Sequence, residues 1–507
     1  LQSRAIVDLG NILSCHSRFR PDRVALVAGE RRLSYAELHA RVSRLARAFV
    51  REGLEKGARV ATVCGNCVEM VEVFWACAMT GAIFVPLSPL LSERTLAVML
   101  DHCGASAVLA DSQTAGTVRR ATNCPLKLIA GARSQEFQNY DDFMAGAPAG
   151  PGIPMTNLGS DPLMIIYSSG TTGDPKGIVL THFARAMYCT LYANAWRMTP
   201  ESVALHAGSL VFNGAYMTLL PSAHLAARFV LMPAFDAAAV LETIARERVT
   251  HMIVVPTQLS ALLSHSDFDE ETVGCLEAVI SMGASLQRRY KDELHRRLPG
   301  RFYELYGLAE GFQTVLDKND YASKPDSVGA PQSFFEIKIL DEQGLDLPVG
   351  EVGEIAGRGP IMMQGYYRRP DLTAAAIPDG WLRSGDMGRL DADGYLYLAD
   401  RKKDMIKSGG VSVYPRDIEE VVVAHPSVQE AVVFGLPDDK WGETPVAAVV
   451  LRDREISAEG LREWINARVG AKFQRISRVI VLDELPRNVA GKPLKRILRE
   501  RFASEVP

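Results

Sequence analysis

The sequence predicts an α/β protein in which a large N-terminal domain of parallel-type αβ layers, with a small β-rich subdomain, is hinged to a small α+β C-terminal domain. In the first third of the chain and again in its middle, amphipathic helices alternate with short apolar strands, which is the pattern of a parallel sheet. From Pro331 to Leu398, short β segments with Gly and Pro turns dominate. A charged run, Asp400–Asp404, then precedes about 100 residues of mixed strands and helices, an ordinary domain size.

These features set the expected domain boundaries. We expect a large domain at 1–400 that includes a β-rich subdomain at about 331–400, a hinge at 401–404 and a small domain at 405–507. A chain of 507 residues corresponds to about three domain-sized units, which fits this division.

The individual elements follow from hydrophobic periodicity and from capping residues. Ser34 and Glu37 form a capping-box pattern that opens a helix through about Glu52. In the large domain we expect strands at 59–63, 107–110, 252–255 and 278–280, and helices near 68–80 and 237–248. In the small domain we expect helices near 417–424, 461–469 and 494–501, and strands at 430–434, 444–451 and 478–481.

Composition narrows the class of protein. The formal net charge is only −4, which argues against a nucleic-acid-binding protein. No apolar run reaches the ~18 residues that span a bilayer, and neither a secretory leader nor a C-terminal Ser-Lys-Leu is present, so the cytoplasm is the expected location. Cys64 and Cys67 have the spacing of a redox or zinc pair, but no second pair has it, so we expect plain buried thiols.

The segment from Tyr167 to Gly177 combines hydroxyls, glycines and one lysine between two apolar runs. Hydroxyls and glycine-exposed amides suit phosphate oxygens, and a lysine adds a point charge. It is not a Walker A loop, because Pro175 precedes the lysine and a glycine follows it. We therefore expect a flexible strand–loop–strand that binds phosphate through Ser168, Ser169, Gly170, Thr171, Thr172, Gly173 and Lys176. The alternative is an ordinary polar turn.

This loop resembles the phosphate loop of the adenylate-forming superfamily, which contains acyl-CoA synthetases, peptide-synthetase adenylation domains and firefly-type luciferases. The resemblance covers nearly the whole chain and is closest to the acyl-CoA synthetase branch. Six further segments resemble family motifs in the family's order: Phe84–Leu87, Ser281–Ser285, Tyr303–Glu310, Gly380–Asp386, Asp400–Asp404 and Pro486–Lys492.

The resemblance implies a role for several residues in binding ATP and Mg²⁺. Tyr306, beside Gly307, is expected to stack on adenine, with Gly283 and Ala284 on the same side. Glu310 is expected to bind Mg²⁺, a hard cation that prefers carboxylate and phosphate oxygens. The ribose is expected to be bound by Asp386 and Arg401. The alternatives are a core tyrosine, a surface glutamate and a turn aspartate.

A second group of residues is implied for catalysis and for CoA. Lys492 is expected to neutralise charge as the carboxylate attacks the α-phosphate of ATP. The thioester step needs a channel for the CoA thiol, so the small domain is expected to rotate between the two steps about Lys403. In the rotated state Gly409 and Gly410 are expected to line that channel.

The acid is expected to bind in an apolar pocket near Tyr306. Relatives commonly carry a histidine near Asn213 and a threonine at the position of Ala309, and this chain departs from both patterns. No acidic residue is evident for the ammonium group of an amino acid, which favours a fatty, branched, hydroxylated or cyclic monocarboxylate. The expected pocket residues are Phe212, Asn213, Gly214, Met282, Leu308 and Ala309, with Tyr216 and Met217 as further candidates.

The sequence therefore predicts an AMP-forming acyl-CoA synthetase that uses ATP, Mg²⁺ and CoA. One alternative is a stand-alone adenylation enzyme that loads a carrier protein. An alternative of another class is a catalytically weak nucleotide-binding sensor, suggested by Ala309. The sequence leaves open whether the protein forms a homo-oligomer.

Overall fold

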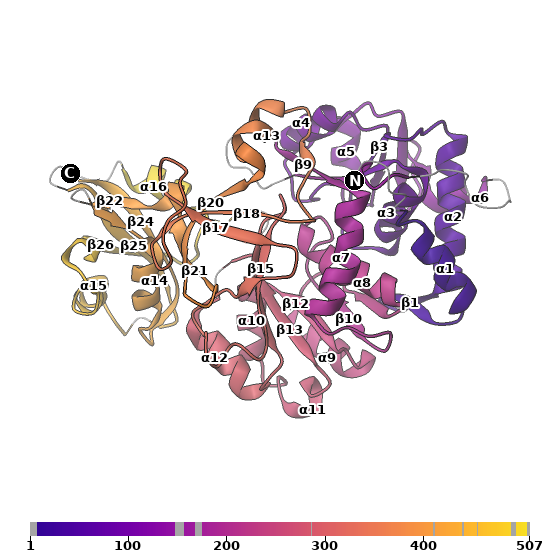
Figure 1. Cartoon of the computed structure of the whole chain (residues 1–507). Coiled ribbons are helices and arrows are strands. Elements are labelled where there is room, and N and C mark those ends of the chain that lie inside the picture. Colours follow the sequence, from indigo (N-terminus) through magenta and orange to yellow (C-terminus); the bar gives the residue numbers. More distant parts are fainter. Residues whose placement is uncertain are drawn as a thin grey trace. The chain divides into compact units, whose positions relative to one another are not determined.

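The computed structural model describes residues 8–147, 157–167, 175–284, 286–408, 411–438, 441–453, 455–487 and 493–503 (Figure 1). The chain divides into two compact units. The first contains Leu1–Pro325, Gly329–Glu336 and Arg358–Leu382, and the second contains Asp326–Val328, Ile337–Gly357 and Arg383–Pro507. Most of the β-rich segment thus groups with the C-terminal residues, and the domain boundaries at 400 and 405 stay a prediction.

The first unit contains an eight-stranded sheet with the order β19-β9-β8-β4-β3-β5-β6-β7. The strands from β4 to β7 pair in parallel, β8 is parallel to β4, and β9 returns antiparallel to β8. Helices between the parallel strands follow the expected βαβ pattern. The strands are β3 (Arg59–Val63), β4 (Ile83–Pro86), β5 (Ala107–Ala110), β6 (Leu126–Ile129), β7 (Gln138–Asn139), β8 (Pro162–Tyr167), β9 (Gly177–Thr181) and β19 (Gly365–Tyr366).

A nine-stranded sheet completes the first unit, with the order β16-β15-β14-β13-β12-β10-β11-β1-β2. The strands from β14 to β1 are parallel, and β2, β15 and β16 are antiparallel additions at the two edges. The strands are β1 (Val24–Ala28), β2 (Arg31–Ser34), β10 (Val203–His206), β11 (Arg228–Leu231), β12 (His251–Val254), β13 (Ala278–Met282), β14 (Phe302–Gly307), β15 (Gln313–Leu316) and β16 (Ala330–Pro331).

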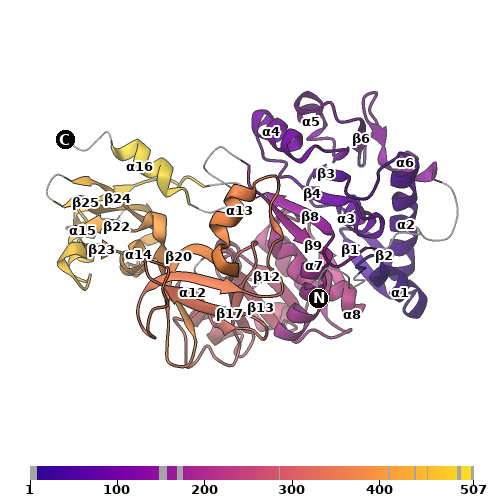
Figure 2. The ribbon, with the colours of Figure 1, turned by 45° about the horizontal axis from the view of Figure 1, so that its top comes forward.

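The helices of the first unit connect these strands, and α2 and α3 lie side by side (Figure 2). The predicted capping box is confirmed: the Ser34 hydroxyl accepts from the Glu37 amide, and the Glu37 carboxylate accepts from the Ser34 amide. The helices are α1 (Asn11–Phe19), α2 (Tyr35–Arg51), α3 (Val68–Thr80), α4 (Glu93–Cys103), α5 (Ala115–Ala121), α6 (Tyr140–Ala145), α7 (His182–Ala195), η1 (Asn213–Ala215), α8 (Tyr216–Leu225), α9 (Ala237–Glu247), α10 (Pro256–Leu263), α11 (Glu270–Val273), α12 (Arg288–Arg297), α13 (Pro370–Ala376) and η2 (Pro378–Gly380).

The second unit contains two smaller sheets. A four-stranded sheet has the order β17-β18-β20-β21, and a second sheet has the order β23-β22-β25-β24 with β26 parallel to β25. The strands are β17 (Glu336–Leu340), β18 (Gly353–Arg358), β20 (Leu382–Leu390), β21 (Leu396–Arg401), β22 (Ile406–Ser408), β23 (Val411–Val413), β24 (Val428–Asp438), β25 (Gly442–Leu451) and β26 (Arg478–Val481). The helices are η3 (Lys402–Asp404), α14 (Pro415–Val423), α15 (Ala458–Asn466), η4 (Lys472–Gln474) and α16 (Lys495–Ala503).

Among the expected helices, the one at 461–469 differs most from its expected bounds. The helix expected at 461–469 begins at Ala458, because the Ser457 hydroxyl accepts from the Gly460 amide and caps it. It ends at Asn466, whose side-chain oxygen accepts from the Ile476 amide at 2.8 Å.

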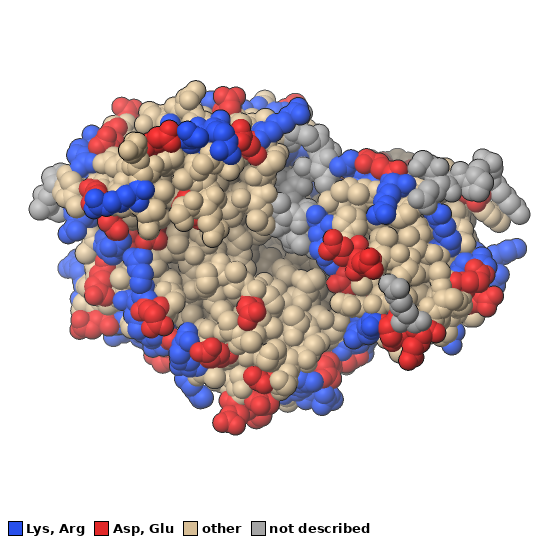
Figure 3. Space-filling model, turned by 180° about the vertical axis from the view of Figure 1, so that it is seen from behind, with Lys and Arg blue, Asp and Glu red and all other residues tan. Residues whose placement is uncertain are grey.

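Cys64 and Cys67 are free thiols as expected, but only Cys64 is buried. Cys67 is half-buried, and the two sulfurs lie 3.9 Å apart. In the described part of the chain, no helix is long and apolar enough to cross a membrane. On the face drawn in Figure 3, basic and acidic side chains alternate, and the described residues there form no continuous basic patch.

Candidate active site

Three predicted motifs of the first unit lie where strands end. β8 ends at Tyr167, directly before the glycine-rich loop, β13 ends at Met282 and β14 ends at Gly307. Ligands of open α/β sheets bind outside the carboxyl ends of the strands. The local geometry at these three ends therefore defines the candidate site.

The glycine-rich segment joins two antiparallel strands, as expected. Tyr167 of β8 pairs with Gly177 of β9, and a Cβ on Gly177 would lie only 2.7 Å from the Ile165 side chain, so glycine fits the close packing. Lys176 directly precedes β9 and is partly exposed. The phosphate-binding candidates Ser168, Ser169, Gly170, Thr171, Thr172 and Gly173 lie outside the described residues.

Tyr306 and Gly307 form the last residues of β14, paired with Thr314 and Gln313 of β15. The Tyr306 ring is partly exposed, and its centroid lies 6.3 Å from that of Phe312. A Cβ on Gly307 would lie 2.8 Å from the Phe312 carbonyl oxygen, so a larger residue would push the two strands apart.

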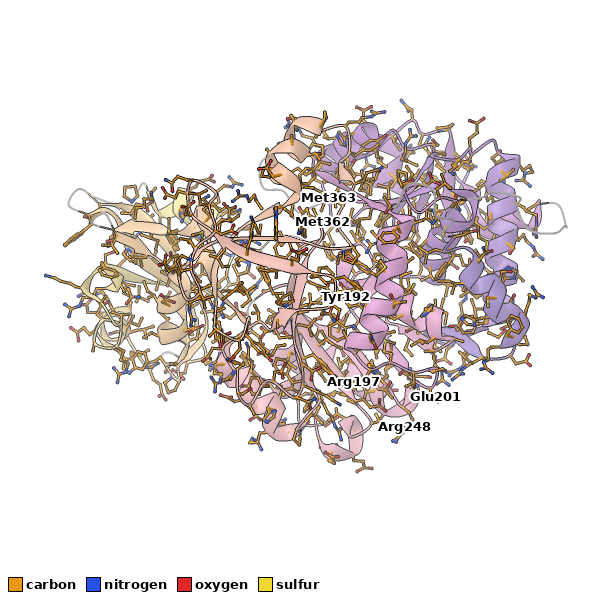
Figure 4. All side chains as sticks on the ribbon, viewed as in Figure 1. Tyr192, Arg197, Glu201, Arg248, Met362 and Met363 are labelled. Carbon is orange, nitrogen blue, oxygen red and sulfur yellow. The ribbon has the colours of Figure 1, made fainter. Side chains whose placement is uncertain are left out.

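Glu310 lies in the turn between β14 and β15. Its backbone carbonyl accepts from the Met363 amide at 2.7 Å, and its carboxylate accepts from the Tyr366 hydroxyl at 3.1 Å. Gly311 has a φ of +143°, and a Cβ there would lie 2.3 Å from the Met362 Cα, so this turn packs directly on the segment that Figure 4 labels at Met362 and Met363. Burial and the Glu310 carboxylate raise the pKa of Tyr366, so its hydroxyl keeps the proton that it donates.

The predicted acid-pocket residues come from separate segments, and two of these meet. A Cβ on Gly214 would lie 3.0 Å from the Met282 sulfur, which joins the η1 turn to the end of β13. Gly283 follows with a φ of +87°, which turns the chain away from the strand. The half-buried candidates are Phe212, Asn213, Gly214, Met282, Leu308 and Ala309, whereas Tyr216 and Met217 belong to the core.

In the second unit, the ribose candidates Asp386 and Arg401 face each other across β20 and β21. They are register partners, and the Arg401 Nε lies 3.6 Å from the Asp386 carboxylate. The hinge candidate Lys403 is exposed in η3, and its backbone carbonyl accepts from Arg499 at 3.4 Å. Arg487 pairs with Pro493 on either side of the segment that contains Lys492. Lys492, Gly409 and Gly410 lie outside the described residues.

A buried ion pair that the sequence did not reveal supports β14. Lys291 of α12 pairs with Glu304, with the two side chains 2% and 3% exposed. Glu304 lies two residues before Tyr306, so the pair fixes the strand that carries the adenine candidate. The sequence signal for it is limited to Glu304, the single charged residue in the run Phe302–Gly307.

A cavity of the first unit lies away from these motifs. It has a volume of about 1060 Å³ and includes Glu201, Arg248 and Arg301, which precede β10, β12 and β14. Figure 4 labels Glu201 and Arg248 near one another and apart from Met362 and Met363. Because these three residues lie at the amino ends of the strands, the cavity lies at the opposite edge of the sheet from Tyr306.

Comparison with known protein families identifies the family to which the chain belongs. The model of the AMP-binding enzyme family matches residues 15–367, and that of the AMP-binding enzyme C-terminal domain matches residues 417–492. The chain belongs to the AMP-binding enzyme family.

Individual members of this family are similar over nearly their whole length. Feruloyl-CoA synthase of Amycolatopsis sp is 35% identical over 495 residues, which cover 96% of this chain and 97% of that protein. Long-chain-fatty-acid–CoA ligase FadD13 of Mycobacterium tuberculosis is 32% identical, covering 94% of each chain. The crystal structure of ATP-bound MatB from Rhodopseudomonas palustris has a TM-score of 0.90 at 29% identity, covering 99% of this chain and 100% of MatB.

Family membership confirms the sequence-based predictions of superfamily and enzyme class. The protein is an adenylate-forming enzyme of the acyl-CoA synthetase branch, and its class is that of an AMP-forming acid–thiol ligase. The α/β fold with a large N-terminal and a small C-terminal domain is that of the family's solved structures. ATP, Mg²⁺ and CoA as cofactor and co-substrates agree with this family.

Lys291→Met tests the buried ion pair behind Tyr306. The variant leaves the Glu304 carboxylate buried without its cation, and breaking such a pair costs about 3–5 kcal/mol. We expect the free energy of unfolding of the first unit, from urea denaturation followed by tryptophan fluorescence, to fall by about that amount. The double variant Lys291→Met with Glu304→Leu should recover most of the loss, and an equal loss in both variants would contradict the pairing.

His206, at the carboxyl end of β10, makes the free energy of unfolding depend on pH. Burial lowers the pKa of His206 from its ordinary 6.5 to about 4. Between these values the unfolded chain binds a proton that the folded chain does not, so the stability contribution of neutral His206 is complete above pH 6.5 and is lost as the pH falls toward 4.

His206→Leu removes this titration. At roughly 1.4 kcal/mol per pKa unit, the difference in unfolding free energy between the wild type and the variant should shift by roughly 3 kcal/mol in favour of the variant between pH 7 and pH 4. Urea denaturation at the two pH values measures it. A difference that is the same at both values would show that His206 does not titrate as described.

Proposed function

We propose that the protein is an ATP-dependent carboxylate–CoA ligase that forms an acyl-adenylate and then a CoA thioester from an apolar monocarboxylate. The acid is fatty, branched, hydroxylated or cyclic. Family membership and the relatives named as CoA ligases support the thioester product. These relatives are named for a feruloyl group and for long-chain fatty acids, which supports an acid with a mainly apolar body and does not select its shape.

The observation that carries this proposal is the placement of the motifs at strand ends. Tyr167, Met282 and Gly307 are each the last residue of a strand, which is where the ligands of open α/β sheets bind. We assign adenine to Tyr306, Gly307, Gly283 and Ala284, and the phosphates to the glycine-rich loop with Lys176. A partly exposed aromatic ring beside a glycine suits a flat base, because every base offers a π-face.

Glu310 fits the role of a Mg²⁺ ligand. Its carboxylate is partly exposed and held in place by the Tyr366 hydroxyl, while its turn is fixed on Met362 and Met363. Among the described residues no cluster of three or more His, Cys, Asp or Glu could hold a metal ion, and Mg²⁺ is commonly bound by one or two carboxylates together with substrate phosphates. Bound Mg²⁺ would neutralise phosphate charge.

The second unit supplies the remaining proposed roles. We assign the ribose hydroxyls to Asp386 and Arg401, whose pairing across β20 and β21 holds the carboxylate in place. We assign transition-state charge neutralisation to Lys492, the pivot of a domain rotation to Lys403, and the CoA channel to Gly409 and Gly410. These assignments rest on the family resemblance of the motifs.

A panel of acids with ATP, Mg²⁺ and CoA tests the proposed reaction. We expect AMP release that requires both an acid and CoA, with a soluble acyl-CoA detected by mass spectrometry. Without CoA, the same acids should support exchange of labelled pyrophosphate into ATP. AMP formation that ignores CoA would favour a carrier-protein acceptor, and no exchange with any acid would refute the proposal.

Lys492→Ala tests the division of the two steps. Loss of one preorganised charge-stabilising group lowers a rate about 10²–10³-fold, so adenylate formation should fall by this amount. Transfer of a supplied acyl-adenylate to CoA should be largely spared, as measured by single-turnover kinetics of each half-reaction. Lys472→Ala, at an exposed lysine of the same unit, is the control. Equal loss in both half-reactions would refute the rotation of the small domain.

A further inference from the structure

Arg185 on α7 is a fully buried cation that has no carboxylate partner among the described residues. Its Nη1 donates to the Asn213 Oδ1 at 2.8 Å and its Nε contacts the Met164 sulfur at 3.0 Å, while its Nη2 is buried without a partner. Burial lowers the pKa of Arg185. A buried charge is ordinarily paired with an opposite charge, so this arrangement calls for an explanation.

Two aromatic rings provide part of the missing compensation. The Arg185 guanidinium lies 4.6 Å from the ring centroid of Tyr188 and 4.9 Å from that of Tyr216. Cation–π contacts of this kind stabilise a desolvated guanidinium. They hold Arg185 in one place, and the Asn213 oxygen accepts from its Nη1.

Arg185 fixes the orientation of the Asn213 amide. A guanidinium only donates, so the atom that faces it must be the Asn213 oxygen. The amide nitrogen then faces the Tyr188 hydroxyl, to which it donates at 2.9 Å. Asn213 is half-buried, unlike Arg185 and Tyr188, and its second N–H has no partner among the described residues. Asn213 thus has a spare, oriented hydrogen-bond donor.

Asn213 is itself one of the residues predicted to line the acid pocket. Asn213 precedes Gly214, whose Cβ position lies 3.0 Å from the Met282 sulfur. At the other end of α7, Tyr192, labelled in Figure 4, donates its hydroxyl hydrogen to Gln313, the register partner of Gly307. The same face of α7 therefore contacts the segments on both sides of the expected pocket.

We propose that Asn213, oriented by Arg185 and Tyr188, donates a hydrogen bond to an oxygen on the acyl part of the substrate. The acid then carries a hydroxyl, alkoxy or oxo group and is not a plain alkyl acid. This inference rests on the proposed function and narrows its substrate class. Arg185 acts as a positioning residue, because it is fully buried and contacts Asn213, which is half-buried.

Matched pairs of acids test the inference. Cinnamic acid is compared with its ring-hydroxylated and methoxylated derivatives, and octanoic acid with its hydroxy and oxo derivatives, by kcat/KM for AMP release. A site built to hydrogen-bond an oxygen discriminates strongly against the analogue that lacks it, so we expect a preference of roughly 10- to 100-fold for an oxygen-bearing acid. In Asn213→Leu and in Arg185→Leu this ratio should fall to within about threefold of unity, mainly through KM. Thr190→Ala, at an exposed position on α7, should keep the wild-type ratio.

Asn213→Asp provides a test that does not depend on Arg185→Leu folding. The carboxylate keeps an oxygen toward Arg185 and compensates its charge, so the melting temperature should rise by about 2–4 °C. The same change removes the donor, so the preference for oxygen-bearing acids should disappear. A higher melting temperature with loss of the preference supports the inference. An unchanged preference in Asn213→Asp overturns it.

The acid panel separates the two proposals. If the wild type uses each oxygen-bearing acid and its deoxy analogue equally, with CoA-dependent AMP release, the inference is overturned and the proposed function stands. If no acid supports AMP release, both are overturned.

Discussion

Parallel strands bring the loops that follow them to one edge of a sheet, and the placement of the candidate site depends on this constraint. β13 and β14 are register partners, with Met282 opposite Leu305, so the segments that follow the two strands leave the sheet close together. Glycines at 283, 307 and 311 then allow turns and contacts that a side chain would block. The buried Lys291–Glu304 pair joins β14 to α12. Strand polarity, more than any single contact, therefore gathers the residues assigned to adenine, Mg²⁺ and the acid.

Much of the fold could be predicted because parallel strands covered by helices read as short apolar runs. The strands at Arg59–Val63, Ala107–Ala110 and Arg478–Val481 have the expected bounds, and the helix at Ala237–Glu247 ends one residue early. The capping box at Ser34 could be predicted because it depends on two residues three positions apart. These features are local, so a single sequence contains the information for them.

The features that could not be predicted depend on contacts between distant segments. Arg185 looks like an ordinary helix residue in the sequence, and it is buried because α7 packs on α8 and β8. The grouping of residues 337–357 and 383–400 with the C-terminal part depends on strand pairing, which local composition does not reveal. Of the candidate site, the meeting of Gly214 with Met282 and the pairing of Asp386 with Arg401 likewise needed three-dimensional structure.

We assign the nucleotide to the carboxyl edge of the sheet, although a cavity of about 1060 Å³ lies at the opposite edge. Photolabelling with an azido-adenine analogue of ATP, followed by peptide mapping, tests this assignment most directly. We expect label on peptides that contain Tyr306 or residues 282–284, and competition by unlabelled ATP. Label confined to peptides that line the opposite cavity, such as those with Arg248 or Lys318, would contradict it.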